Sequence, residues 1–285
     1  MKPGLPGLLL GIAALICAAP VTAATSGTPE LRLGSVAMDT PTAMHRRLKP
    51  LIDYLTGELG RPVTLKLSPD LSNAAEDVAR GEVDIAYLTP VAYIKAHKSG
   101  GVRLVAKTVT KGKSSFKLML VVRKDGPIKS TKDLAGKSFA FGDQAAILQR
   151  AVVINAGVRL EQLGSYKFLG HYDNIARGVA NGDFAAGILK DTTAYQWEKQ
   201  GLRIIYVSPP LPPYNIVTSR HVPDMLWHAI QQAFLKLNPK NPNHMAIMNA
   251  LDPSYDGFAA TADAEYDIVR TLIRPFEMKE TPNKR

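Results

Sequence analysis

The sequence predicts an α/β protein built from two lobes, and three observations support this prediction. First, 46% of the 285 residues are hydrophobic and 21% are charged, a composition typical of a folded chain with a sizeable core. Second, strand-like and helix-like segments alternate at a spacing typical of mostly parallel sheets with helices on both faces. Third, the proline-rich run 208–213 interrupts this alternation and cannot lie inside a central strand. We therefore expect the chain to cross between lobes at this run.

The first 24 residues have the order of parts found in a secretory signal peptide. A basic start is followed by an apolar stretch over residues 8–19 and by the small residues Ala23 and Ala24. The stretch is shorter than the roughly 20 residues that a membrane span needs. We expect residues 1–24 to be cleaved on export, with an uncleaved anchor as the alternative. The one cysteine, Cys17, lies in this segment, so the mature chain would have no thiol for catalysis, metal binding or a disulfide.

The segments of the first lobe follow from capping residues and apolar periodicity. A first strand is predicted over residues 31–34. Thr40 and Pro41 then supply an N-cap and a first-turn proline for a helix whose apolar residues, from Met44 to Leu59, share one face. The alternation continues with strands over 62–67, 83–87 and 103–109 and with helices over 72–80 and 90–97.

The second half of the chain shows the same alternation. The apolar run KLMLVVR, residues 117–123, predicts a strand. Further strands are predicted over 138–141, 166–169, 184–188, 203–207 and 216–219. Helices are predicted over 147–155, 174–180, 192–199, 225–237, 245–251 and 262–274.

The sequence lacks the motifs of the common catalytic and cofactor-binding sites. Two Gly-Lys-Ser triplets, at 112–114 and 136–138, lack the glycine that a phosphate-binding loop has five residues earlier. A dinucleotide-binding glycine motif, a nucleophile elbow and a zinc helix are also missing, and no two of the six histidines are four residues apart. We expect no catalytic residue, cofactor or metal. A net charge of +10 without a basic run favours an anionic small ligand over nucleic acid.

A set of short motifs occurs in one order along the chain and resembles a known family. The motifs are Pro69-Asp70, GEVDIAYLTP (81–90), VRKD (122–125), DLAGKSFAFGD (133–143), GHYD (170–173) and GVANGD (178–183). Together they resemble the periplasmic solute-binding proteins of the phosphate, phosphite and phosphonate ABC transporter family.

The resemblance implies the type II periplasmic-binding-protein fold, in which two α/β lobes close around a ligand. Residues 25–118 and 216–285 would form a discontinuous first lobe, and residues 119–215 the second, with hinge crossings near 119–124 and 208–216. A monomer would deliver a small molecule, in this family an oxyanion, to an ABC permease. The alternative is a ligand-sensing module for a membrane sensor kinase or respiratory regulator. A cofactor-free enzyme on a related fold would need reactive groups that the sequence does not display.

The resemblance also places the ligand and shows where this chain departs from the family. Family members grip the oxyanion with a hydroxyl-rich turn at a helix N-terminus. Here the matching residues are Gln144-Ala145-Ala146-Ile147, without hydroxyls, and Asp143 directly before them adds a negative charge. We therefore expect a changed ligand that is larger, less charged or more apolar. The ligand-binding residues that we predict are Tyr87, Thr89, Asp143, Gln144, Ala145, His171, Asp173 and Tyr214.

For three of these residues, the prediction of a ligand-binding role has a specific reason. His171 follows a strand at its carboxyl end, where open α/β sheets bind ligands, and a neutral imidazole can donate to an oxyanion. Asp173 could hold a cationic group of the ligand or serve only as a helix N-cap. Tyr214 stands near the second crossing, where aminophosphonate binders of the family place an acid.

Overall fold

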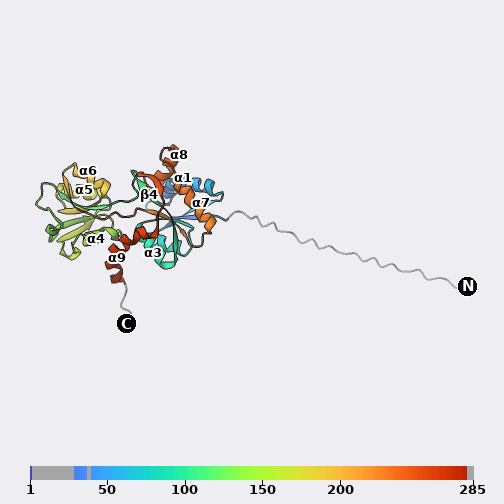
Figure 1. Cartoon of the computed structure of the whole chain (residues 1–285), viewed down its shortest axis with the longest axis horizontal. Helices are drawn as coiled ribbons and strands as arrows, with labels where there is room; N and C mark the ends of the chain where they lie inside the picture. The colour runs from blue at the N-terminus through green and yellow to red at the C-terminus, as the bar shows by residue number, and fades with distance from the viewer. Residues whose placement is uncertain (2–28, 37–39, 281–285) are drawn as a thin grey trace, which may run out of the picture.

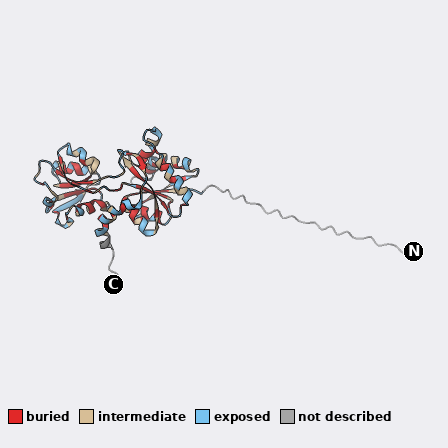
Figure 2. Ribbon diagram, viewed as in Figure 1, coloured by how far each residue is buried: buried red, intermediate tan, exposed pale blue. Residues whose placement is uncertain are grey.

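The computed structural model describes Met1, residues 29–36 and residues 40–280 (Figure 1). Apart from Met1, the predicted signal peptide, residues 1–24, lies outside these residues. The described chain forms two sheets that lie side by side, each with its own covering helices. Buried residues concentrate in the strands and on the helix faces against them (Figure 2).

The first sheet has six strands in the order β11-β4-β10-β3-β1-β2. Their bounds are β1 Leu31–Val36, β2 Val63–Ser68, β3 Ile85–Leu88, β4 Val102–Thr110, β10 Asn215–Ser219 and β11 Tyr255–Ala259. One face packs on α1 (Pro41–Leu59), α7 (Asp224–Leu235) and α8 (Pro242–Leu251), and the other on α2 (Leu71–Ala79) and α3 (Pro90–Gly100). Successive strand residues alternate between these faces, so Ile216 belongs to one core and Val217 to the other.

The second sheet has five strands in the order β7-β6-β8-β5-β9. Their bounds are β5 Leu118–Arg123, β6 Ser138–Phe141, β7 Ser165–Phe168, β8 Ala186–Lys190 and β9 Leu202–Val207. One face packs on α4 (Ile147–Asn155), and the other on α5 (Tyr172–Asn181) and α6 (Asp191–Glu198). Three short 3-10 helices span Thr131–Leu134, Leu160–Gln162 and Asp263–Tyr266.

Both sheets are mixed, so the prediction of mostly parallel sheets is wrong. In the first sheet β1 runs parallel to β2 and β3, but β10 is antiparallel to both of its neighbours, β3 and β4. In the second, β6 runs parallel to β7 and β8, whereas β5 is antiparallel to β8 and β9. β5 and β10 are the strands that follow the two crossings. Each is antiparallel to its neighbours because the chain enters its sheet from the other sheet.

Two segments connect the sheets, residues 111–117 between β4 and β5 and residues 208–214 between β9 and β10. They pair with each other, since Phe116 and Leu211 exchange backbone N–H···O bonds of 3.0 and 2.8 Å. The first crossing therefore precedes the predicted position, 119–124. That position is wrong because the KLMLVVR run is a central strand, bonded to β8 and β9. The lobe boundaries themselves remain a prediction.

The C-terminal helix α9 (Asp267–Glu280) lies beside helices that belong to both sheets. It packs against α3 of the first sheet and α4 of the second (Figure 1). Tyr266, Val269 and Leu272 are buried in the core cluster that also contains residues of α3 and α4. The end of the described chain thus adds a third contact between the two halves.

Candidate functional site

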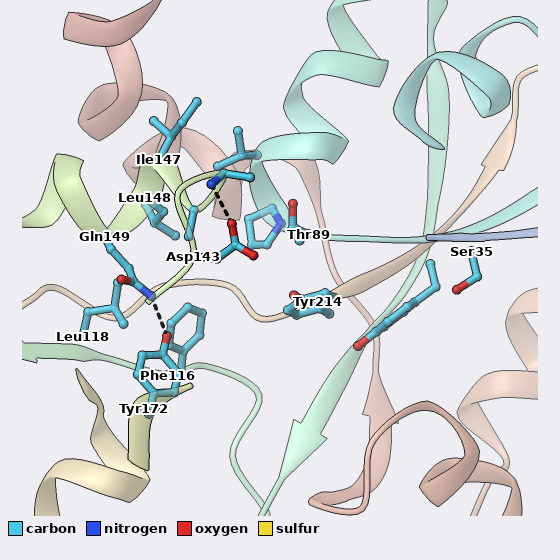
Figure 3. A pocket seen from close by; sticks show the side chains of 15 residues that line it. Ser35, Thr89, Phe116, Leu118, Asp143, Ile147, Leu148, Gln149, Tyr172 and Tyr214 are labelled. Atoms are coloured by element: carbon cyan, nitrogen blue, oxygen red, sulfur yellow. Dashed lines mark hydrogen bonds between the residues drawn. The ribbon is translucent and has the colours of Figure 1, made fainter. Parts of the chain in front are cut away.

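A central cavity of about 300 Å³ lies where the carboxyl ends of strands from both sheets meet the crossing segments (Figure 3). Its lining residues are Ser35, Tyr87, Thr89, Pro90, Val91, Phe116, Leu118, Asp143, Ala145, Ala146, Ile147, Leu148, Gln149, Tyr172 and Tyr214. Open α/β sheets bind ligands at this end because the loops that follow the strands diverge there. The central cavity is therefore the candidate ligand site.

One wall comes from the first sheet and the second crossing. Tyr87 lies on β3, and Tyr214 directly precedes β10. Their rings stack with centroids 5.0 Å apart and planes inclined by 23°. The hydroxyl of Tyr87 also bonds the hydroxyl of Tyr255 at 2.5 Å. This fixed pair leaves Tyr214 38% exposed, whereas Tyr87 is 7% exposed, so the Tyr214 ring is the one that the cavity can use.

The opposite wall comes from the first crossing and the second sheet. Phe116 lies in the first crossing, and Tyr172 begins α5, the helix that follows β7. Both rings are partly exposed, and Figure 3 shows them across the cavity from Tyr214. Burial raises the pKa of Tyr172 to about 12, so its hydroxyl stays protonated at neutral pH.

The turn that follows β6 carries the only carboxylate among the described residues that line the cavity. The Asp143 carboxylate accepts the backbone N–H of Ala145 at 2.7 Å, and its backbone oxygen accepts the N–H of Ala146 at 3.0 Å. Helix α4 begins just beyond this turn, and its N-cap, Ala146, has no side-chain cap. Asp143 thus places a negative charge at a helix N-terminus, the place where helices attract anions.

Gln149 holds this turn in place. Its side chain is 7% exposed, and its Oε1 accepts the backbone N–H of Gly142 at 2.8 Å. Its Nε2 lies 3.4 Å from the Tyr172 hydroxyl, at the outer limit of a hydrogen bond. Gln149 is a polar residue among apolar neighbours on the buried face of α4. This pattern is visible in the sequence, but the predicted site did not include Gln149.

The structure brings five of the predicted residues together around the central cavity, namely Tyr87, Thr89, Asp143, Ala145 and Tyr214. The predicted residues Gln144, His171 and Asp173 do not line it, and all three are exposed. His171 is the N-cap residue of α5 and makes no side-chain cap bond. Thr89 also has a structural role, because its hydroxyl accepts the N–H of Ala92 at 3.1 Å and caps α3. The binding roles of the eight residues remain predictions.

The charges of the lining show what the central cavity favours chemically. Among the described residues of the lining, Asp143 is the one ionised side chain, and none is an arginine, lysine or histidine. Burial, and then the carboxylates of Asp252 and Asp143, raise the pKa of Tyr214. The described part of the chain holds no cluster of three or more metal-ligating side chains, and none of its helices combines the length and hydropathy of a membrane crossing.

The sequence and the fold both match known proteins. Residues 33–266 match the family model for the periplasmic substrate-binding protein of a phosphonate ABC transporter. The phosphate-import protein PhnD of Mycolicibacterium smegmatis is 27% identical over 189 residues. That match covers 61% of this chain and 59% of the relative, so the chain matches less than two thirds of the relative's length.

Solved structures of low identity share the fold. A Xanthomonas citri protein bound to ATP superposes with a TM-score of 0.71 at 18% identity, covering 87% of this chain and 97% of the other. PhnD1 from Prochlorococcus marinus in complex with methylphosphonate gives 0.68 at 17% identity, covering 87% and 98%. The binding protein component of an ABC phosphonate transporter from Pseudomonas aeruginosa gives 0.64 at 18%, covering 90% of each chain. The predicted type II periplasmic-binding-protein fold is confirmed.

Proposed function

The chain belongs to the family of periplasmic substrate-binding proteins of phosphonate ABC transporters, and on this premise we propose that it captures a small solute in the central cavity and delivers it to a membrane permease. The position of the cavity supports this role, because its walls come from both sheets. A ligand that touches both walls stabilises the closed arrangement of the lobes. The two paired crossings, 111–117 and 208–214, are the segments about which the lobes would rotate.

We propose further that the solute is neither inorganic phosphate nor methylphosphonate. The observation that carries this proposal is the Asp143 carboxylate, which already accepts the N–H of Ala145 at the beginning of α4. An anion at this turn would compete for the same donor and lie next to a like charge. Two unit charges 4 Å apart repel by about 4 kcal/mol at an effective dielectric constant near 20. No hydroxyl of the turn offsets that cost, because Gln144, Ala145 and Ala146 occupy the positions where the family has hydroxyls.

The positive net charge of the chain does not make phosphate or methylphosphonate a favoured ligand of the cavity. The chain carries +10, which attracts anions at long range. Exposed charges are screened beyond about 8 Å at physiological salt, whereas contacts inside a cavity are not. The selection of the solute therefore follows from the lining, which is aromatic and negative.

A thermal-shift screen of the exported protein tests both parts of the proposal. The panel contains phosphate, phosphite, methylphosphonate, sulfate, amino acids, aromatic acids and organic amines. A ligand at a hundredfold excess over its Kd stabilises the folded state by about 2.7 kcal/mol, which is a readily measured rise in Tm. We expect the oxyanions to leave Tm unchanged and a larger, less anionic solute to raise it. A rise with millimolar or lower phosphate or methylphosphonate would show that the family's ligand is retained.

A further inference from the structure

The central cavity presents aromatic faces on two sides and one carboxylate. On one side the Tyr214 ring is backed by Tyr87, and Tyr214 is 38% exposed. The partly exposed rings of Phe116 and Tyr172 lie on the other side, with Asp143 at the turn above them (Figure 3). Aromatic faces carry negative electrostatic potential and attract cations within about 6 Å of the ring centre. Both kinds of group in this lining therefore favour positive charge.

The carboxylates around the cavity add to this potential. Burial and the Asp252 and Asp143 carboxylates raise the pKa of Tyr214, and burial chiefly raises the pKa of Tyr172, with a smaller contribution from Asp191. Both phenols thus experience negative charge from residues outside their own elements. The direction of these shifts agrees with the geometry, in which Asp143 is the ionised residue of the lining that the structure describes.

Two lysines of the described chain lie near residues of the central cavity without lining it. The Lys190 ammonium lies 5.7 Å from the centre of the Phe116 ring, but Lys190 lines a neighbouring cavity of about 200 Å³ together with Lys111 and Lys113. Lys107 forms an ion pair with Glu265. No arginine, lysine or histidine is therefore found among the described residues that line the central cavity.

We propose, resting on the proposed function, that the central cavity binds a compact organic cation, an ammonium group with apolar substituents. The ammonium would lie between the Tyr214 ring and the Phe116 and Tyr172 rings, within reach of the Asp143 carboxylate. A volume of about 300 Å³ is at the small end of ligand pockets and suits such a molecule. The apolar substituents would displace water from the half-exposed rings, while the charge would determine the choice of ligand.

Calorimetric titration with two molecules of the same shape separates charge from size. The probes are choline and 3,3-dimethyl-1-butanol, in which a quaternary carbon replaces the charged nitrogen. We expect saturable binding of choline that is at least tenfold tighter than that of the uncharged alcohol. Equal binding of the two probes, or no binding of choline, would overturn the cation proposal.

Two pairs of variants assign the preference to the cavity. Asp143→Asn removes the charge but keeps a side-chain oxygen for the N–H of Ala145, so the turn is retained, and we expect choline affinity to fall at least fivefold. Asp183→Asn is the control: it removes an exposed carboxylate after the C-terminal end of α5 and should leave the choline affinity unchanged. Tyr214→Leu should weaken choline binding as much as Asp143→Asn, whereas Tyr214→Phe keeps the ring and should retain it.

The outcomes also separate this proposal from the proposed function. If neither probe binds but an aromatic acid from the thermal-shift panel does, the cation proposal is wrong and the transport role with an altered solute stands. If phosphate or methylphosphonate binds with micromolar affinity, both the cation proposal and the altered solute are wrong.

Discussion

Gln149→Met tests how the turn of the candidate site is held. The side chain is 7% exposed, and its Oε1 accepts the N–H of Gly142, which is itself buried, at 2.8 Å. Methionine has a similar length but supplies no comparable acceptor, so the substitution leaves a buried backbone N–H without a partner. The cost of such a group is about 1–3 kcal/mol. This is a large part of the roughly 5–15 kcal/mol by which a typical domain is stable.

Urea unfolding followed by circular dichroism measures this cost. We expect the transition midpoint to fall at an unchanged m-value, because the surface exposed on unfolding is the same. Tyr172→Phe removes only the 3.4 Å contact with Gln149 Nε2 and should cost less than about 0.5 kcal/mol. Gln196→Met, on the exposed side of α6, is the matched control and should be neutral. A Gln149→Met protein as stable as the parent would refute the role assigned to this side chain.

Two further predictions concern the first sheet and the C-terminal segment. Tyr87→Phe should lower the free energy of unfolding by about 1–3 kcal/mol, because the buried Tyr255 hydroxyl loses its hydrogen bond to Tyr87. In a double-mutant cycle measured by urea unfolding, Tyr87→Phe combined with Tyr255→Phe should cost less than the sum of the two single changes. Burial opposes ionisation of Asp263, but hydrogen bonds from Arg270 and Tyr93 outweigh it and hold the pKa of Asp263 below its ordinary value. A lowered carboxyl pKa stabilises the fold above the unfolded pKa, near 4, and this stabilisation disappears as the pH falls through the folded pKa. Asp263→Asn should therefore lower the free energy of unfolding at pH 7 and flatten its decline below pH 4, and an unchanged pH profile would contradict the assignment.

The sequence predicted most elements of the fold because their signals are local. Thr40 and Pro41 begin α1 as expected, and the apolar periodicity placed the helices and nearly all strands within a few residues. Strand β11, residues 255–259, was not predicted, since it is a short edge strand with Gly257 inside it. Strand direction was also missed, because the pairing of β10 between β3 and β4 depends on residues more than a hundred positions apart.

The candidate site was predictable where a residue follows a strand within a recognisable motif. Tyr87, Thr89 and Asp143 stand in such motifs, and all three line the central cavity. Phe116 was missed because the first crossing was placed several residues too late. His171 was preferred to its neighbour Tyr172, although Tyr172 is the one in the lining, because the direction of a side chain at the start of a helix depends on where that helix begins.

The most direct test of the proposed change of ligand is titration calorimetry of the protein with inorganic phosphate and methylphosphonate. The Asp143 carboxylate already occupies the first donor of the turn, and the three residues after it supply no hydroxyl. Each missing hydrogen bond to a charged group is worth about 1.5–3 kcal/mol, so three together remove micromolar affinity. We predict no saturable heat at micromolar concentrations of either anion. Micromolar binding of phosphate or methylphosphonate that is lost in His171→Ala would contradict the altered ligand and place the oxyanion at the family's position.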